Sequence, residues 1–121
     1  MTARILVVDD IESNVRLLQA KLSAEYYEVL TANDGPTALA IAQSERPDIV
    51  LLDVMMPGMD GFDVCRRLKE DDDLAHIPVV AVTAFAMKGD EERIREGGCE
   101  AYISKPISVT HFLDTIRRLL N

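Results

Sequence analysis

The chain has 121 residues, of which 48% are hydrophobic and 28% charged, a composition typical of one globular domain and not of a disordered chain. Its net charge of −8, from 21 acidic and 13 basic residues, argues against direct binding to nucleic acid or to an anionic membrane surface. No apolar run approaches the roughly 18 residues of a membrane span, and no charged leader precedes an apolar stretch, so we expect a cytoplasmic protein without membrane insertion.

Five short apolar runs recur along the chain and predict β-strands. The first, third and fourth are rich in β-branched residues, and their nearly continuous hydrophobicity is typical of a parallel sheet that is covered on both faces. The runs are Ile5–Val8, Glu28–Thr31, Ile49–Leu52, Val79–Val82 and Ala101–Ile103.

Amphipathic segments lie between and after these runs and predict helices. Their apolar faces are formed by Val15, Leu18 and Leu22, by Ala38, Ile41 and Ala42, by Val64, Cys65 and Leu68, and by Val109, Phe112, Leu113, Ile116 and Leu120. The second helix follows the turn sequence NDGP, and Ser108 is the expected N-cap of the last. A further segment, Met87–Glu96, is charged nearly all round, so we expect a helix there that is held weakly.

The alternation of strands and helices predicts one doubly wound α/β domain over residues 1–121. In such folds, ligands bind beyond the carboxyl ends of the strands. The residues that follow the apolar runs there are Asp9, Asp10, Asp53, Thr83 and Lys105. Three carboxylates, a hydroxyl and an amine are therefore expected on one rim of the sheet.

Three neighbouring carboxylates favour a bound cation. Two charges about 4 Å apart repel by about 4 kcal/mol at an effective dielectric constant of 20. Oxygen ligands and few protein contacts suit Mg²⁺. The sequence has no EF-hand pattern for calcium and no His/Cys cluster for zinc, so we expect Mg²⁺.

A carboxylate beside a divalent cation can accept a phosphoryl group as an aspartyl phosphate. The negative charge of the transferring group would be stabilised by the metal together with Lys105 and Thr83. The sequence has no glycine-rich nucleotide-binding loop. The expected donor is therefore a phosphorylated protein or a small phosphodonor and not ATP.

Four motifs in this order resemble the receiver domain of two-component response regulators, across essentially the whole chain. They are VVDD at 7–10, LLDVMMPGMDG at 51–61, VTA at 82–84 and SKP at 104–106. The resemblance implies a flavodoxin-like (βα)5 fold with a five-stranded parallel sheet in the order 2-1-3-4-5. It also implies a phosphoacceptor signalling domain, not an enzyme, that receives its phosphoryl group from a histidine kinase or a histidine phosphotransfer protein.

The resemblance also implies roles for the residues of the acceptor site. Asp53 would be the phosphoacceptor and a Mg²⁺ ligand. Asp10 would bind the ion directly, Asp9 directly or through water, and Met55 through its backbone carbonyl. Thr83 would then bond a phosphoryl oxygen.

Further residues would transmit the signal. Lys105 would pair with the phosphate or with Asp53 and form a cis peptide bond with Pro106. Tyr102 would move inward as the switch aromatic when Thr83 is drawn toward the phosphate. The surface of the fourth helix, fifth strand and fifth helix would carry the signal, with a phosphorylation-dependent dimer as one outcome.

A finer resemblance divides the chain. Residues up to about Cys65 resemble the first receiver of PleD-type diguanylate cyclases, and residues from about Leu68 resemble DivK-type single-domain regulators of cell division. One relative with traits of both, or a chimera joined between Cys65 and Leu68, would explain this. The downstream partner would be a kinase or a diguanylate cyclase output, and no output domain is expected within the chain.

Two other functions stay open at this point. An Asp-nucleophile hydrolase also uses Mg²⁺, but it would carry an acid/base Asp two residues beyond the nucleophile, where this chain has Met55. A phosphorylation-independent interaction module would not need the complete acceptor set. Separately, Cys65 and Cys99 lack a CxxC spacing and are expected to be reduced thiols.

Overall fold

A computed structural model describes residues 3–53, 58, 61–83, 98–104 and 109–120 of the chain. Its five strands form one parallel sheet in the order β2-β1-β3-β4-β5, which confirms the expected topology. Each strand contains its predicted apolar run and is one residue longer. The strands are β1 (Arg4–Val8), β2 (Glu28–Ala32), β3 (Ile49–Asp53), β4 (Val79–Thr83) and β5 (Ala101–Ser104).

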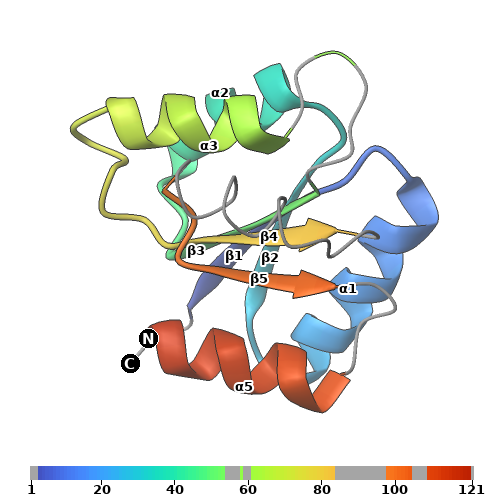
Figure 1. Cartoon of the computed structure of the whole chain (residues 1–121). Coiled ribbons are helices and arrows are strands. Elements are labelled where there is room, and N and C mark those ends of the chain that lie inside the picture. The colour runs from blue at the N-terminus through green and yellow to red at the C-terminus, as the bar shows by residue number, and fades with distance from the viewer. Residues whose placement is uncertain (1–2, 54–57, 59–60, 84–97, 105–108, 121) are drawn as a thin grey trace.

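Helices cover both faces of the sheet, with α2 and α3 on one face and α1 and α5 on the other (Figure 1). Their bounds are α1 (Glu12–Ala24), α2 (Gly35–Glu45), α3 (Gly61–Glu70) and α5 (Val109–Leu120). The predicted helix over Met87–Glu96 and the predicted N-cap Ser108 lie outside the described residues. Among the described helices, none is both long and apolar enough to span a membrane.

The strands alternate their side chains between two hydrophobic clusters. In β1, Leu6 and Val8 point into the cluster beneath α2 and α3, whereas Ile5 and Val7 point into the cluster beneath α1 and α5. All four are buried, because the sheet is covered on both faces. This is why the strands read as continuous apolar runs.

The helices bury the faces that the sequence predicts. Among the described side chains of these faces, all are buried except Ile41 and Leu120, which pack against the clusters while partly exposed. The NDGP turn does open α2: the Asp34 carboxylate accepts a hydrogen bond of 2.7 Å from the Thr37 backbone N–H, and Pro36 lies in the first turn. The same hydrogen bond lowers the pKa of Asp34.

A candidate metal centre at the carboxyl edge of the sheet

The strand order places two acidic residues side by side. The chain leaves β1 toward β2 on one side, and β3 pairs with β1 on the other, so the strand order reverses between β1 and β3, and ligands of such sheets bind outside the carboxyl ends of the strands at this point. Val8 is in register with Leu52, and the next residues along the two strands are Asp9 and Asp53. The topology therefore brings together residues that lie far apart in the sequence.

Asp9, Asp10 and Asp53 form a compact carboxylate cluster. One oxygen atom from each side chain lies within 4.8 Å of the others. Asp9 is only 2% exposed and Asp53 only 4%, whereas Asp10 faces solvent. The sequence prediction that these three residues meet at one rim is confirmed.

Hydrogen bonds fix the position of Asp9 within the cluster. Its Oδ1 accepts from the Ile11 backbone N–H at 2.9 Å, and its Oδ2 accepts from the Asn14 Nδ2 at 3.3 Å. Asn33 Nδ2 donates to the Asp9 backbone carbonyl at 3.3 Å, and the Asp9 backbone N–H donates to Ala32 at 3.2 Å. Both carboxylate oxygens and both backbone groups of Asp9 are thus engaged.

Sequence reasoning missed Asn14 and Asn33 as supporting residues of this site. Asn14 lies in the first turns of the helix that follows the Asp pair, and Asn33 follows β2, the neighbour of β1. The sequence shows amide donors soon after β1 and directly after β2, but not the group to which they donate. The side-chain partner itself depends on the register of strands and the placement of α1, which no short motif encodes.

The donor set fits a hard divalent cation. At an effective dielectric constant of 20, two carboxylate charges less than 5 Å apart repel by about 3–4 kcal/mol, and burial of two of them adds a desolvation cost. A cation placed between the three oxygens would offset both terms. Carboxylate oxygens with one solvent-facing side match the preference of Mg²⁺, which retains several of its waters.

The structure describes only part of the remaining predicted acceptor set. Thr83 ends β4 and follows Val82, the register partner of Asp53, so its backbone lies beside the cluster strand. The side chain of Thr83, together with Met55, Lys105 and Pro106, lies outside the described part. Their predicted roles, including the cis peptide bond, stay predictions.

Tyr102, the predicted switch aromatic, is described. It lies in β5 and is partly buried against the cluster beneath α2 and α3. It is thus neither fully packed away nor fully exposed.

Residues 5–117 match the response regulator receiver domain family. The chain belongs to this family and is a phosphoacceptor signalling module of two-component systems. Of the functions that the sequence left open, the family match supports the receiver domain over a hydrolase or a phosphorylation-independent interaction module.

Two groups of relatives resemble the chain over nearly its whole length. The response regulator PleD of Caulobacter vibrioides (strain NA1000 / CB15N) is 60% identical over 119 residues, which cover 98% of this chain but 26% of that protein. The polar-differentiation response regulator DivK of Brucella anthropi is 52% identical over 120 residues, which cover 99% of this chain and 98% of that protein. The chain therefore spans about a quarter of the PleD relative and nearly all of the DivK relative.

Solved structures confirm the fold. The chemotaxis protein CheY4 of Vibrio cholerae superimposes with a TM-score of 0.94 at 31% identity, covering 99% of this chain and 100% of that one. The receiver domain of the sensor histidine kinase PA1611 from Pseudomonas aeruginosa PAO1 gives 0.91 at 28% identity, covering 99% and 98%. That structure has a magnesium ion coordinated in its active-site cleft.

The comparisons do not support a chimera joined between Cys65 and Leu68. Each of the PleD and DivK relatives aligns across essentially the whole chain at 50% identity or more. A single receiver that is related to both explains the mixed motifs without a junction.

Proposed function

We propose that the chain accepts a phosphoryl group on Asp53, in a Mg²⁺-dependent step, from a phosphohistidine of a histidine kinase or a histidine phosphotransfer protein. The observation that supports this most strongly is the cluster itself. Three carboxylates meet within 4.8 Å at the carboxyl ends of the neighbouring strands β1 and β3, in a chain that belongs to the receiver family.

Asp9 and Asp53 are suited to different roles. Both carboxylate oxygens of Asp9 accept hydrogen bonds from the start of α1, so the orientation of this side chain is fixed. We assign it, with the exposed Asp10, to holding the cation. Asp53 closes β3 in a nearly fully buried position, where exclusion of water would slow hydrolysis of an acyl phosphate.

In the proposed step, a carboxylate oxygen of Asp53 attacks the phosphorus atom of the donor phosphohistidine. The phosphorus–nitrogen bond breaks, and the histidine leaves with its electron pair. When bound, Mg²⁺ would supply positive charge to the phosphoryl oxygens. We assign the hydroxyl of Thr83 and the amine of Lys105 to the same oxygens.

The output is proposed to run through β5. Tyr102 is half-buried beside the α2/α3 cluster, so it can change its exposure at small cost when Thr83 moves toward the phosphate. The resulting change in the surface around β5 and α5 would alter binding of a downstream kinase, of a diguanylate cyclase output or of a second copy of the chain. We place the protein in the cytoplasm, where such kinases act.

Intact-mass measurement tests the proposal. With Mg²⁺ and a small phosphodonor such as acetyl phosphate, the wild type should gain one hydroxylamine-labile adduct of about 80 Da, the mass of one phosphoryl group on a carboxylate. Asp53→Asn should gain none. Asp72→Asn, which removes an exposed carboxylate from the α3–β4 connection, is the matched control and should behave like the wild type.

Two results would overturn the proposal. One is the lack of an adduct on the wild type in the presence of Mg²⁺. The other is an adduct on Asp53→Asn in the same yield as on the wild type.

A further inference from the structure

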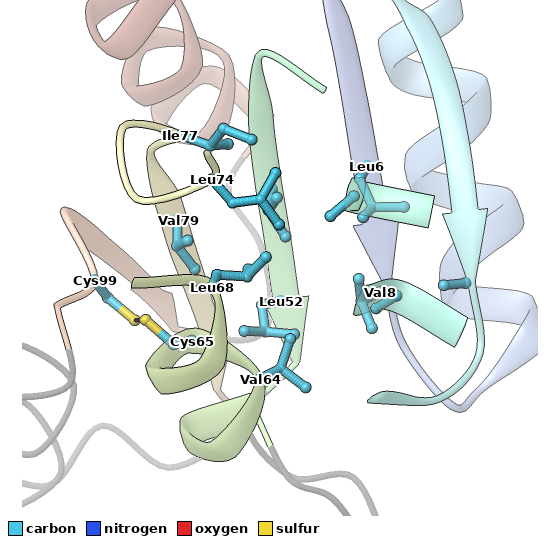
Figure 2. Close-up of a cluster of buried hydrophobic side chains, with 14 of the residues drawn as sticks. Leu6, Val8, Leu52, Val64, Cys65, Leu68, Leu74, Ile77, Val79 and Cys99 are labelled. Carbon is cyan, nitrogen blue, oxygen red and sulfur yellow. Dashed lines mark hydrogen bonds between the residues drawn. The ribbon is translucent and has the colours of Figure 1, made fainter. Parts of the chain in front are cut away.

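The two cysteines of the chain form a buried pair that the phosphoacceptor chemistry does not use. Cys65 comes from α3 and Cys99 from the segment just before β5, and their side chains point toward one another (Figure 2). The Cys99 thiol donates a hydrogen bond to the Cys65 sulfur, and the two Sγ atoms are 3.1 Å apart. Cys65 is 0% exposed and Cys99 is 7% exposed.

The backbone on the Cys99 side is held firmly against α3 and β4. The Glu100 carboxylate binds the Lys69 ammonium at 2.6 Å through one oxygen and the Val79 backbone N–H at 2.6 Å through the other. Lys69 lies one turn after Cys65 on α3 and also donates to the carbonyls of Ala75 and Ile77. These contacts hold the segment that carries Cys99 against the helix that carries Cys65.

A glycine permits this close approach. Gly98 has a φ of +95°, and a Cβ atom added there would lie 2.9 Å from Lys69 Cγ. The chain therefore runs directly over the Lys69 side chain before it reaches Cys99. The thiol pair is built by α3 and by the start of β5 together.

We infer that Cys65 and Cys99 are a redox-active pair that a peroxide converts into a reversible disulfide between α3 and the start of β5. A disulfide requires the sulfur atoms to approach from 3.1 Å to about 2.05 Å, a shift of roughly 1 Å. Reduced thiols are the resting form in a reducing compartment, and the disulfide is the oxidised form.

The hydrogen bond sets the order of the two chemical steps. The hydrogen bond from the Cys99 thiol lowers the pKa of Cys65; the Lys69 ammonium lowers it further, and burial opposes both effects. The same hydrogen bond raises the pKa of Cys99. The Cys65 thiolate attacks one oxygen of hydrogen peroxide, the O–O bond breaks, and Cys65 becomes a sulfenic acid. The Cys99 sulfur then attacks Cys65 Sγ, and the S–O bond breaks.

The atoms and electrons of this reaction balance. The two thiols give two electrons to the peroxide, and their two protons convert the two released hydroxides into water. A dithiol reductant reverses the bond by thiol–disulfide exchange. The product links residues that are far apart in the chain, so it should raise the melting temperature by several degrees.

The disulfide would lie next to the proposed output element. Both cysteines and Tyr102 contact the same cluster beneath α2 and α3, and Tyr102 follows Cys99 by three residues. Cys99 precedes β5, whereas the carboxylate cluster lies at the opposite, carboxyl edge of the sheet. Oxidation should therefore leave the capacity of Asp53 to be phosphorylated intact.

The decisive experiment treats the folded, reduced wild type with hydrogen peroxide, then denatures it, alkylates it with N-ethylmaleimide and measures intact mass. We expect a monomer that is lighter than the reduced chain by about 2 Da, with no alkylated thiol, and that dithiothreitol restores. Its melting temperature should rise on oxidation and fall back on reduction.

Cys65→Ala and Cys99→Ala are the matched variants, because neither can form the internal bond, and their melting temperatures should not rise with peroxide. The inference is overturned if the folded wild type keeps two alkylatable thiols. It is equally overturned if the products are only sulfinic acids or intermolecular disulfides, or if the internal bond forms only in denaturant.

Discussion

Asp10 differs from its two neighbours in the carboxylate cluster because it faces solvent. The Asp9 carboxylate is fixed by hydrogen bonds to the start of α1, and the Asp53 carboxylate is nearly fully buried. The fold therefore determines the positions of both carboxylates. The Asp10 side chain is exposed, so water screens its charge. A mutation of Asp10 can therefore change the charge of the cluster without removing a buried side chain from the fold.

Replacing Asp10 with Asn should stabilise the metal-free fold and weaken its response to Mg²⁺. Loss of one charge should raise the free energy of unfolding by about 1 kcal/mol, less than the full repulsion because the side chain is exposed. Saturating Mg²⁺ should then stabilise the wild type more than the variant. Urea denaturation with and without Mg²⁺ measures both effects.

Asp72→Asn is the control for this comparison, because it removes an exposed carboxylate that precedes β4, whereas the cluster lies at the carboxyl ends of the strands. Its response to Mg²⁺ should equal that of the wild type. An equal response of Asp10→Asn would show that Asp10 does not bind the cation.

At the scale of the elements, Glu100 joins three parts of the domain. Its two carboxylate oxygens bind Lys69 of α3 and the first residue of β4, and its own backbone N–H donates to the Val79 carbonyl at 3.0 Å. Removing it would leave a partly buried ammonium and a strand N–H without their carboxylate partner. The contact therefore fixes the start of β5, the strand that carries Tyr102.

We expect Glu100→Ala to lower the free energy of unfolding by about 1–3 kcal/mol, because it removes two charge-assisted hydrogen bonds at once. Glu70→Ala is the matched control: Glu70 is exposed and lies 4.0 Å from Arg66, so its loss should stay within about 0.5 kcal/mol. Urea denaturation of both variants provides the comparison. Equal losses would mean that Glu100 is only a surface ion pair.

Two glycines with positive φ separate backbone strain from steric contact. Gly58 has a φ of +76°, and no atom of the described residues lies within 4 Å of a Cβ added there. A Cβ added at Gly98 would lie 2.9 Å from Lys69 Cγ. Lys69 is anchored at its far end, so it cannot move away freely. Thermal denaturation should therefore show that Gly98→Ala lowers the free energy of unfolding more than Gly58→Ala does, by about 1 kcal/mol or more. Equal losses of unfolding free energy in the two variants would mean that the Lys69 side chain moves aside without cost.

The elements themselves could be predicted from sequence because each one buries a recognisable face. Strands such as Ile49–Asp53, buried on both sides, appear as unbroken apolar runs, and α3 shows its face through Val64, Cys65 and Leu68. Their polar cross-connections could not be predicted. The Lys69–Glu100 pair and the Cys65–Cys99 contact span more than 30 residues and depend on how α3 sits over β4 and β5.

At the scale of the whole molecule, strand order is what creates the site. Any order that separated β1 from β3 would place Asp9 and Asp53 apart, although the same motifs would stand in the sequence. The rim of carboxylates could be predicted because parallel strands share one carboxyl edge. The supporting amides of Asn14 and Asn33 could not, because they reach Asp9 from separate elements across that edge.

Locating the phosphoryl group in the wild type tests the central claim most directly. After reaction with a small phosphodonor and Mg²⁺, borohydride reduces an aspartyl phosphate to homoserine, which peptide sequencing can place on the chain. We predict homoserine at position 53 alone, and none when Mg²⁺ is chelated. Homoserine at position 9 or 10, or labelling at position 53 that is independent of Mg²⁺, would contradict the account.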